Sequence, residues 1–163
     1  MVKATFGLPA ETIILVDMPM IVVGADTTAG RALLEALDAT AREIRVFVTD
    51  EGRALELKEA GFKVATGDVS DDSHIEAAAT RCFSAVLISE AAHDARERSF
   101  ADTAAEVLAG WANAASNSEV RRVIWVTDGD YPETDVSEVA VVDPSDTGFV
   151  RTIVDLDEAD TLS

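Results

Sequence analysis

Two glycines six residues apart, Gly24 and Gly30, give the clearest chemical signal in the sequence. An apolar run, Met20–Val23, precedes the first glycine, and helical spacing of apolar residues begins at the second. This order predicts a buried parallel strand, a tight turn and the start of a helix. Free backbone N–H groups at a helix start can bind the pyrophosphate of a dinucleotide. The stretch therefore predicts a dinucleotide-binding loop formed by Gly24, Asp26, Thr27, Thr28 and Gly30.

Thr27 stands where a loop of the Gly-x-x-Gly-x-x-Gly type has its middle glycine. That glycine marks the closest approach of the backbone to the pyrophosphate, so a side chain here is expected to crowd the ligand unless the loop shifts. Asp26 adds a negative charge close to the expected phosphates. Both residues predict weaker binding than an intact loop would give, and a protein that binds no nucleotide remains an alternative.

A second expected strand, Ile44–Val48, ends at Thr49 and Asp50. In a dinucleotide-binding fold the residue at this strand end meets the adenosine ribose, where an acid favours NAD and an arginine favours NADP. Thr49 and Asp50 occupy the position, and Arg53 comes only one helical turn later. The sequence therefore favours NAD, with the alternative that Asp50 only caps the following helix.

Alternating strands and helices must position these residues. Strands are expected at 20–23, 44–48, 62–66, 82–88 and 120–127, and helices at 31–41, 53–60, 73–81 and 99–116. This alternation predicts an α/β fold, a Rossmann-like three-layer sandwich with a five-stranded parallel sheet in the order 3-2-1-4-5 and helices on both faces. Any ligand is expected at the switch point between the first and fourth strands, outside Gly24 and Ser89.

The expected organisation has three parts: an N-terminal extension at 1–19, a Rossmann-like dinucleotide-binding domain at 20–128 and an acidic C-terminal extension at 129–163. Residues 12–16 predict either an edge strand or a partner-binding arm. The apolar runs 139–142 and 149–154 predict short edge strands or a partner-binding segment. Residues 155–160 predict a solvated acidic tail.

Composition narrows the functional classes. A chain of 163 residues with 48% hydrophobic residues can bury a core, and its formal charge of −18 would repel nucleic acid and anionic membranes. No apolar run reaches the roughly 20 residues that a membrane span needs. One cysteine, Cys82, expected in the core, and two histidines argue against a disulfide and a metal site. We expect a cytoplasmic protein, or one in an organelle interior if a targeting peptide has been removed.

From Met20 to Asp128 the chain resembles the atypical short-chain dehydrogenase/reductases, and within them the NmrA-like NAD(P)-binding proteins. The resemblance is carried by the loop 24–30, the turn after Val48, the Gly67-Asp68-Val69-Ser70-Asp71 turn, the strand 85–89 and Val120–Thr127. It implies NAD or NADP as cofactor, with Asp68 beside the adenine, Val69 among the cofactor-binding residues and Ser89 near the nicotinamide ribose. In the alternative, Asp68 caps a turn and Ser89 ends a strand.

Departures from this family bear on catalysis. Its reductase branch needs a Tyr-x-x-x-Lys pair, but Tyr131 is followed four residues later by Asp135, and no lysine occurs after Lys63. Beyond Thr127 the chain is shorter than the substrate-covering lobe of a full family member. We therefore expect a non-catalytic NAD(P)-binding protein without catalytic residues, either a nucleotide or redox sensor or an accessory subunit. The alternative is a small NAD(P)-dependent oxidoreductase that acts with a partner chain, and both predict a protein partner or a homo-oligomer.

Overall fold

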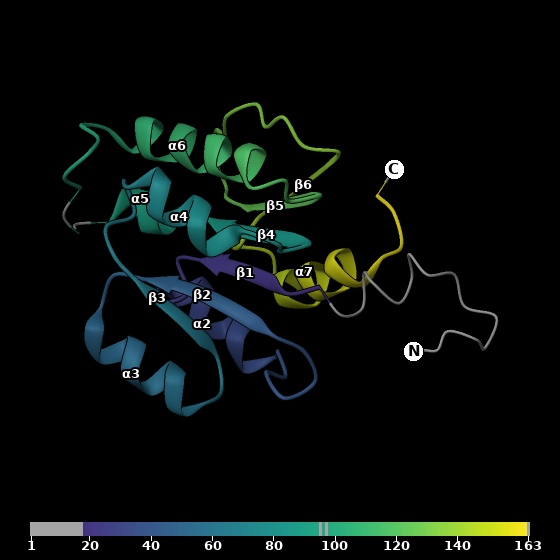
Figure 1. Ribbon diagram of the computed structural model, residues 1–163. Coiled ribbons are helices and arrows are strands. Elements are labelled where there is room, and N and C mark those ends of the chain that lie inside the picture. The colour runs from purple at the N-terminus through teal and green to yellow at the C-terminus, as the bar shows by residue number, and fades with distance from the viewer. Residues whose placement is uncertain (1–17, 95, 97, 163) are drawn as a thin grey trace.

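Six parallel strands form one sheet in the order β3-β2-β1-β4-β5-β6 (Figure 1). The computed structural model describes residues 18–94, 96 and 98–162, so the expected strand or arm at 12–16 lies outside the described residues. The strands are β1 Met20–Val23, β2 Ile44–Val48, β3 Lys63–Thr66, β4 Ser84–Ile88, β5 Arg122–Val126 and β6 Glu138–Val142.

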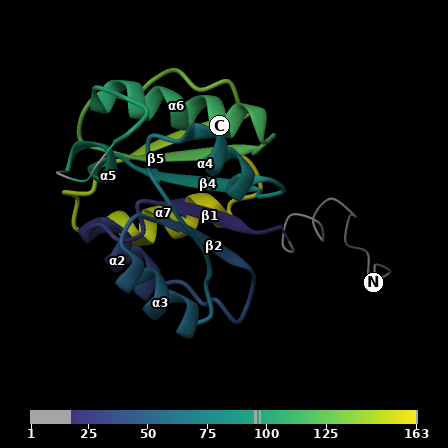
Figure 2. The same cartoon turned by 60° about the vertical axis from the view of Figure 1, so that its left-hand side comes forward.

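The helices lie in two layers, one on each face of the sheet (Figures 1 and 2). Helices α4 Asp72–Ala79, α5 Glu90–His93 and α6 Ala104–Asn117 cover one face. Helices α2 Thr28–Glu35, α3 Glu51–Glu59 and α7 Phe149–Glu158 cover the other. The α/β class, the Rossmann-like layering and the order 3-2-1-4-5 are thus confirmed.

The sheet holds one strand more than the five expected. Residues 138–142, within the expected acidic extension, pair in parallel with β5 and form the edge strand β6. The edge position explains the mixed pattern of the strand, because Val142 is buried whereas Val139 and Val141 are exposed. The apolar run 149–154 lies in a helix, not in an edge strand.

Strand β1 lies in the middle of the core. All four of its residues are buried, as a central strand covered on both faces requires. Ile21 and Val23 pack towards α4 and α6, whereas Met20 and Val22 pack towards α2, α3 and α7. This packing fixes where the carboxyl end of β1, and therefore the glycine loop, emerges from the sheet.

A buried arginine ties the C-terminal part of the chain to the sheet. Arg122 on β5 has a fully buried side chain that pairs with Glu138 of β6 at 2.7 Å. Its Nη1 also donates to three carbonyl oxygens at the end of α7, those of Leu156, Asp157 and Ala159. The carbonyl groups at a helix end have no partner within the helix, so the guanidinium caps α7.

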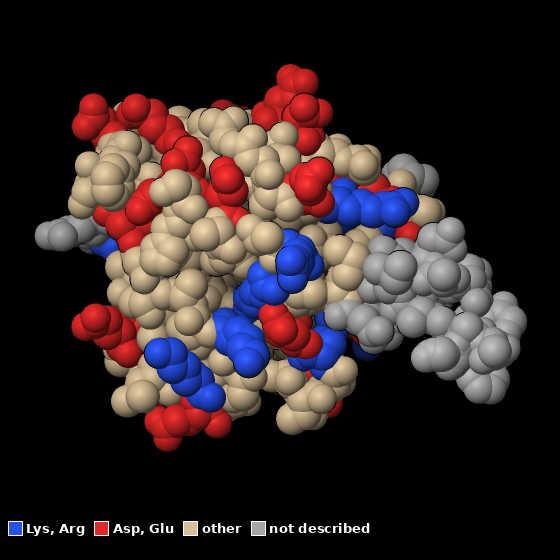
Figure 3. Space-filling view, viewed as in Figure 1, with Lys and Arg blue, Asp and Glu red and all other residues tan. Residues whose placement is uncertain are grey.

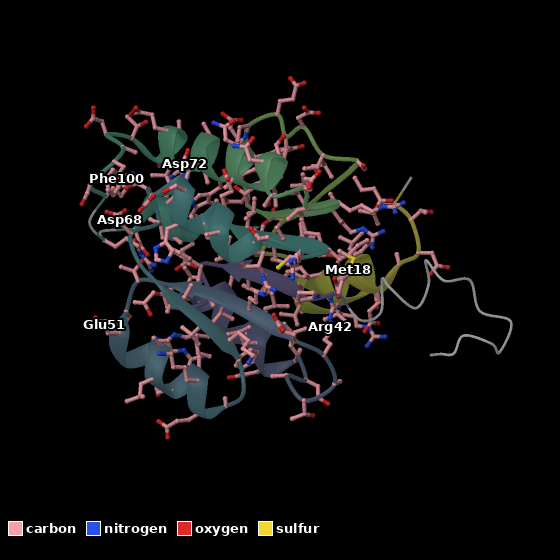
Figure 4. The ribbon with its side chains drawn as sticks, in the orientation of Figure 1. Met18, Arg42, Glu51, Asp68, Asp72 and Phe100 are labelled. Atoms are coloured by element: carbon pink, nitrogen blue, oxygen red, sulfur yellow. The ribbon has the colours of Figure 1, made fainter. Side chains whose placement is uncertain are left out.

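The expectation of a solvated tail at 155–160 is wrong in part: Asp155, Glu158 and Asp160 are exposed, but the segment belongs largely to helix α7. Asp157 is buried, with 7% exposure, and its Oδ2 accepts from Arg42 at 2.6 Å. Arg42 in turn donates to the carbonyl of Met18, at the edge of the sheet opposite Glu51 and Asp68 (Figure 4). Counting acidic residues missed this contact because the arginine partners lie far away in the sequence.

The surface charge is unevenly distributed. On the face seen in Figure 3, basic side chains gather across the middle and acidic ones lie along the upper and lower margins. Among the described residues, no helix has the length and apolar character needed to cross a membrane.

Replacing Arg122 with Ala should lower the free energy of unfolding by about 3–5 kcal/mol, because Glu138 and the carbonyls of α7 would lose a buried partner. Urea denaturation followed by circular dichroism measures this loss. Arg121→Ala is the matched control: its exposed neighbouring side chain should change stability by no more than about 0.5 kcal/mol. Equal effects of the two substitutions would contradict the capping role of Arg122.

Candidate functional site

The loop after β1 makes a sharp bend at Gly24, which has φ +90°, in the left-handed region that favours glycine. A Cβ on Gly24 would lie 3.1 Å from the Ile88 Cβ, so β4 also limits the space here. At Gly30 a Cβ would lie 2.7 Å from the Ala25 Cα, closer than real Cβ atoms come. The first and third glycines therefore let α2 start directly against the bend.

Thr27 is the N-cap of α2, and its side chain lies inside the loop. Its Oγ1 donates to the Gly24 carbonyl at 2.6 Å and accepts from the Gly30 N–H at 3.0 Å. The residue is 3% exposed, so its side chain is enclosed in the loop and does not project from it. The Thr27 hydroxyl is thus the N-cap of α2.

The start of α2 keeps free donors. Within the part of the chain that the structure describes, the N–H groups of Thr28 and Ala29 have no acceptor, whereas that of Arg31 bonds to the Thr27 carbonyl. Such N–H groups, together with the helix dipole, favour an anion at this position. The geometry therefore fits a phosphate group at the start of α2.

Asp26 joins the glycine loop to the end of β2. Its Oδ2 accepts from the backbone N–H groups of Thr49 and Asp50, at 3.0 and 3.2 Å. Its Oδ1 accepts from Arg96 Nη1 at 2.9 Å, and its side chain is only 3% exposed. Burial opposes ionisation, but the hydrogen bonds from Arg96, Thr49 and Asp50 outweigh it and lower the pKa of the Asp26 carboxyl.

Arg96 is a site residue that sequence reasoning missed. It follows α5 in the chain, and its guanidinium pairs with Asp26, with Asp94 at 2.6 Å, and with Thr49 Oγ1 at 3.2 Å. Its partner Asp26 lies 70 residues earlier. No local pattern marks such a contact, because only the strand order brings the two segments together.

Asp68 holds a turn, as one of the two expectations had it. Its Oδ1 accepts from the N–H and Oγ of Ser70, and its Oδ2 accepts from the Ser99 N–H at 2.8 Å. Burial opposes ionisation of Asp68, but these hydrogen bonds outweigh it and lower the pKa. Figure 4 shows Asp68 beside Phe100, whose N–H donates to Ser70 Oγ. The carboxylate thus anchors the segment that follows Arg96.

Val69 faces the core. It is completely buried, and its carbonyl accepts from Trp111 Nε1 at 2.7 Å. The side chain of Val69 therefore positions the Asp68 turn against α6 and does not line either of the hollows described below.

An open hollow of about 730 Å³ lies at the carboxyl ends of β2 and β3. We call it the β2–β3 hollow, and its lining residues are Thr49, Asp50, Glu51, Gly52, Thr66, Gly67 and Asp68. Asp50 also caps α3 by accepting from the Gly52 N–H at 3.0 Å, so it forms the expected cap and lines the hollow as well. Three of the seven lining residues are acidic, which suits hydroxyl donors better than anions.

A second hollow of about 460 Å³ lies at the carboxyl ends of β4 and β5. In this β4–β5 hollow, apolar side chains such as Ile88 and Leu108 stand beside the polar residues Ser89, His93 and Thr127. Sequence reasoning did not select His93, although it follows Ser89 by one helical turn and so can share its face. Ala29 of α2 also lines the hollow, so the glycine loop lies between the two hollows.

Other reactive residues lie away from these hollows. Tyr131 packs against Trp125 and does not line the β4–β5 hollow. Cys82 is buried, and burial raises the pKa of its thiol to about 11, so it is a poor nucleophile. Across residues 18–94, 96 and 98–162, no group of three His, Cys, Asp or Glu side chains could hold a metal ion.

Comparison with known proteins identifies the family. Residues 24–160 match a family model described as NAD(P)H-binding. The chain belongs to this NAD(P)H-binding family. The match confirms the NAD(P)-binding Rossmann relationship suggested by the glycine loop, and it includes β6 and α7. No curated protein sequence matches the chain significantly.

Solved structures of reductases share the fold. The anaerobillin reductase ChuY from Escherichia coli is 23% identical with a TM-score of 0.52, over 67% of this chain and 50% of that one. The triphenylmethane reductase from Citrobacter, solved with NADP(H), is 19% identical with a TM-score of 0.53, over 66% and 36%. An NADPH-dependent quinone oxidoreductase from Escherichia coli, solved with NADPH, is 20% identical with a TM-score of 0.51, over 66% and 36%. The matches thus span between about a third and a half of the length of these structures.

Replacing Thr27 with Ala should lower the free energy of unfolding by about 1–2 kcal/mol, because both hydrogen bonds of its hydroxyl are lost. Thr27→Ser should restore most of this stability. The exposed neighbour Thr28 provides the control, and Thr28→Ala should leave the urea midpoint nearly unchanged. If the Thr27→Ala variant is as stable as the wild-type protein, the hydroxyl does not hold the loop.

Proposed function

We propose that the chain binds NAD(H) along the carboxyl edge of the sheet, with one half of the dinucleotide in each hollow. The observation that carries the proposal is the pair of free N–H groups, of Thr28 and Ala29, placed between two hollows. A dinucleotide needs this order: a pyrophosphate site with a nucleoside site on either side. The family match supports a nicotinamide cofactor.

Several of the predicted site residues then have a role. The adenosine lies in the β2–β3 hollow, where Thr49, Asp50 and Asp68 offer acceptors to hydroxyl and amino groups. The pyrophosphate lies over Thr28 and Ala29. The nicotinamide half lies in the β4–β5 hollow, with Ser89 near its ribose.

We further propose that a partner binds the chain in its nucleotide-bound form, so that the chain acts as a nucleotide or redox sensor or as an accessory subunit. The position of Tyr131 supports this proposal, because the residue packs on Trp125, outside the β4–β5 hollow. The partner is another protein or a second copy of the chain, and it binds at the edge of the sheet where the two hollows open.

An oxidoreductase is the second candidate function, and the β4–β5 hollow favours it. Beside the expected nicotinamide site the hollow holds an imidazole, His93, and two hydroxyls, of Ser89 and Thr127. Reduced nicotinamide supplies a hydride when bound. His93 would donate a proton to the acceptor atom that gains negative charge, and Thr127 would orient that atom.

Filling the β4–β5 hollow should weaken the binding of the nicotinamide half of the ligand and leave the binding of the adenosine half unchanged. Ala105→Trp places a large side chain in this hollow from the exposed side of α6, so NADH should bind at least about tenfold more weakly while ADP binding is unchanged. Calorimetric titration measures both affinities. Ala109→Trp, exposed one turn later on the same helix, is the control and should alter neither. Equal loss of NADH and ADP binding would contradict the proposed placement.

Consumption of NADH in the presence of quinones and dyes separates the two candidate functions. A sensor or accessory subunit should consume NADH no faster than a protein-free blank. An oxidoreductase should turn over, and His93→Gln should slow it by about 10²–10⁴-fold without weakening NADH binding. Turnover that is unaffected by His93→Gln would exclude the imidazole as the proton donor.

A further inference from the structure

Donors that suit a phosphate converge on the Asp26 carboxylate. The backbone N–H groups of Thr49 and Asp50 reach one oxygen, and the Arg96 guanidinium reaches the other. Two backbone donors together with an arginine form a typical oxyanion site. In this structure the occupant of that site is a carboxylate from the chain itself.

This oxyanion site lies where the two forms of the cofactor differ. Thr49 and Asp50 follow β2, and the end of this strand meets the adenosine ribose in the proposed binding mode. An arginine there usually accommodates a 2′-phosphate. Arg96 reaches Thr49 Oγ1 at 3.2 Å, so a cation is present although it comes from a different segment.

The cation is already neutralised. Asp26 and Asp94 both pair with Arg96, at 2.9 and 2.6 Å, so the three side chains together carry a negative charge. Asp50, Glu51 and Asp68 line the adjoining hollow and add to it. A 2′-phosphate would compete with a buried carboxylate for the same donors and would meet like charges on several sides.

We propose that Asp26 occupies the place of the adenosine 2′-phosphate and thereby makes the chain select NAD(H) over NADP(H). The inference rests on the proposed function, since it concerns the same dinucleotide site. It assigns selectivity to an acid in the glycine loop, acting at the end of β2 through Thr49, Asp50 and Arg96.

Contacts other than Asp26 hold the donors in place. Asp94 binds Arg96 on its other side, and Asp68 holds the following segment through the Ser99 N–H. Thr49 and Asp50 are fixed by β2 and by the cap of α3. Removing the Asp26 carboxylate therefore leaves an open anion site, and a 2′-phosphate can enter it.

The test measures the affinities of NADH and NADPH for the full chain by calorimetry. The wild-type protein should bind NADH at least about tenfold more tightly than NADPH, because the 2′-phosphate would meet like charges at the site. Asp26→Ser should strengthen NADPH binding by about tenfold or more and change NADH binding far less. Adding Arg96→Gln to this variant should abolish the gain.

Glu35→Ser is the control, because it removes one negative charge from the exposed last residue of α2, at the other end of that helix from the glycine loop. It should not alter the preference, whereas a similar shift would assign the effect to net charge and overturn the inference. Asp26→Ala, which also empties the site, replaces Asp26→Ser if the latter does not fold, and the wild-type ratio of the two affinities tests the inference in either case. Wild-type binding of NADPH as tight as that of NADH overturns the inference and leaves the proposed function intact. Binding of neither overturns both.

Discussion

The contact between the start of α2 and the bend after β1 sets the geometry on which the whole site depends. Gly30 lies so close to Ala25 that any side chain would clash, and Gly24 adopts a backbone conformation that favours glycine. Thr27 closes the loop from within. Because β1 is buried in the middle of the sheet, this loop opens at the switch point, with a hollow on each side.

Several of the acidic side chains that give this protein its large negative charge hold segments of the fold together. Asp26 fastens the glycine loop to β2, and Asp68 fastens the segment after α5 to the turn after β3. Asp157 pairs with Arg42 at the opposite edge of the sheet. Each carboxylate accepts hydrogen bonds from defined donors, so part of the acidic surplus is used inside the fold and is not simply a solvated surface.

The sequence predicted those features that depend on local pattern. Apolar runs and glycine spacing located β1, β2, β4, β5 and the loop between Gly24 and Gly30, and strand alternation gave the order of the first five strands. Thr49 and Asp50 were assigned to the adenosine ribose and Asp68 to the adenine, and the three residues line one hollow. Such features are visible because the strand ends of a parallel sheet meet at one edge.

Features that depend on distant contacts could not be read in this way. The edge strand was one of the two expectations for 139–142, but its parallel pairing with β5 and the helix α7 were missed, because Arg122 and Arg42, which pair with the acidic residues of this segment, lie outside it. Arg96 was missed for the same reason, since its partner Asp26 lies far away in the sequence. The direction of the Thr27 side chain depends on its rotamer, which the spacing of residues does not predict. His93 could have been found from its spacing of one helical turn after Ser89, but the short helix α5 that gives this spacing its meaning was not expected.

The most direct test of the account is an NMR titration of the ¹⁵N-labelled chain with NADH. We expect saturable shifts of the Thr28 and Ala29 N–H signals, together with shifts of residues in both hollows, such as Asp68 and Ser89. These signals should move with a single binding constant, because one ligand spans the site. The account would be contradicted if saturating NADH left the Thr28 and Ala29 signals unmoved, or if it shifted only the signals of residues away from the carboxyl edge of the sheet.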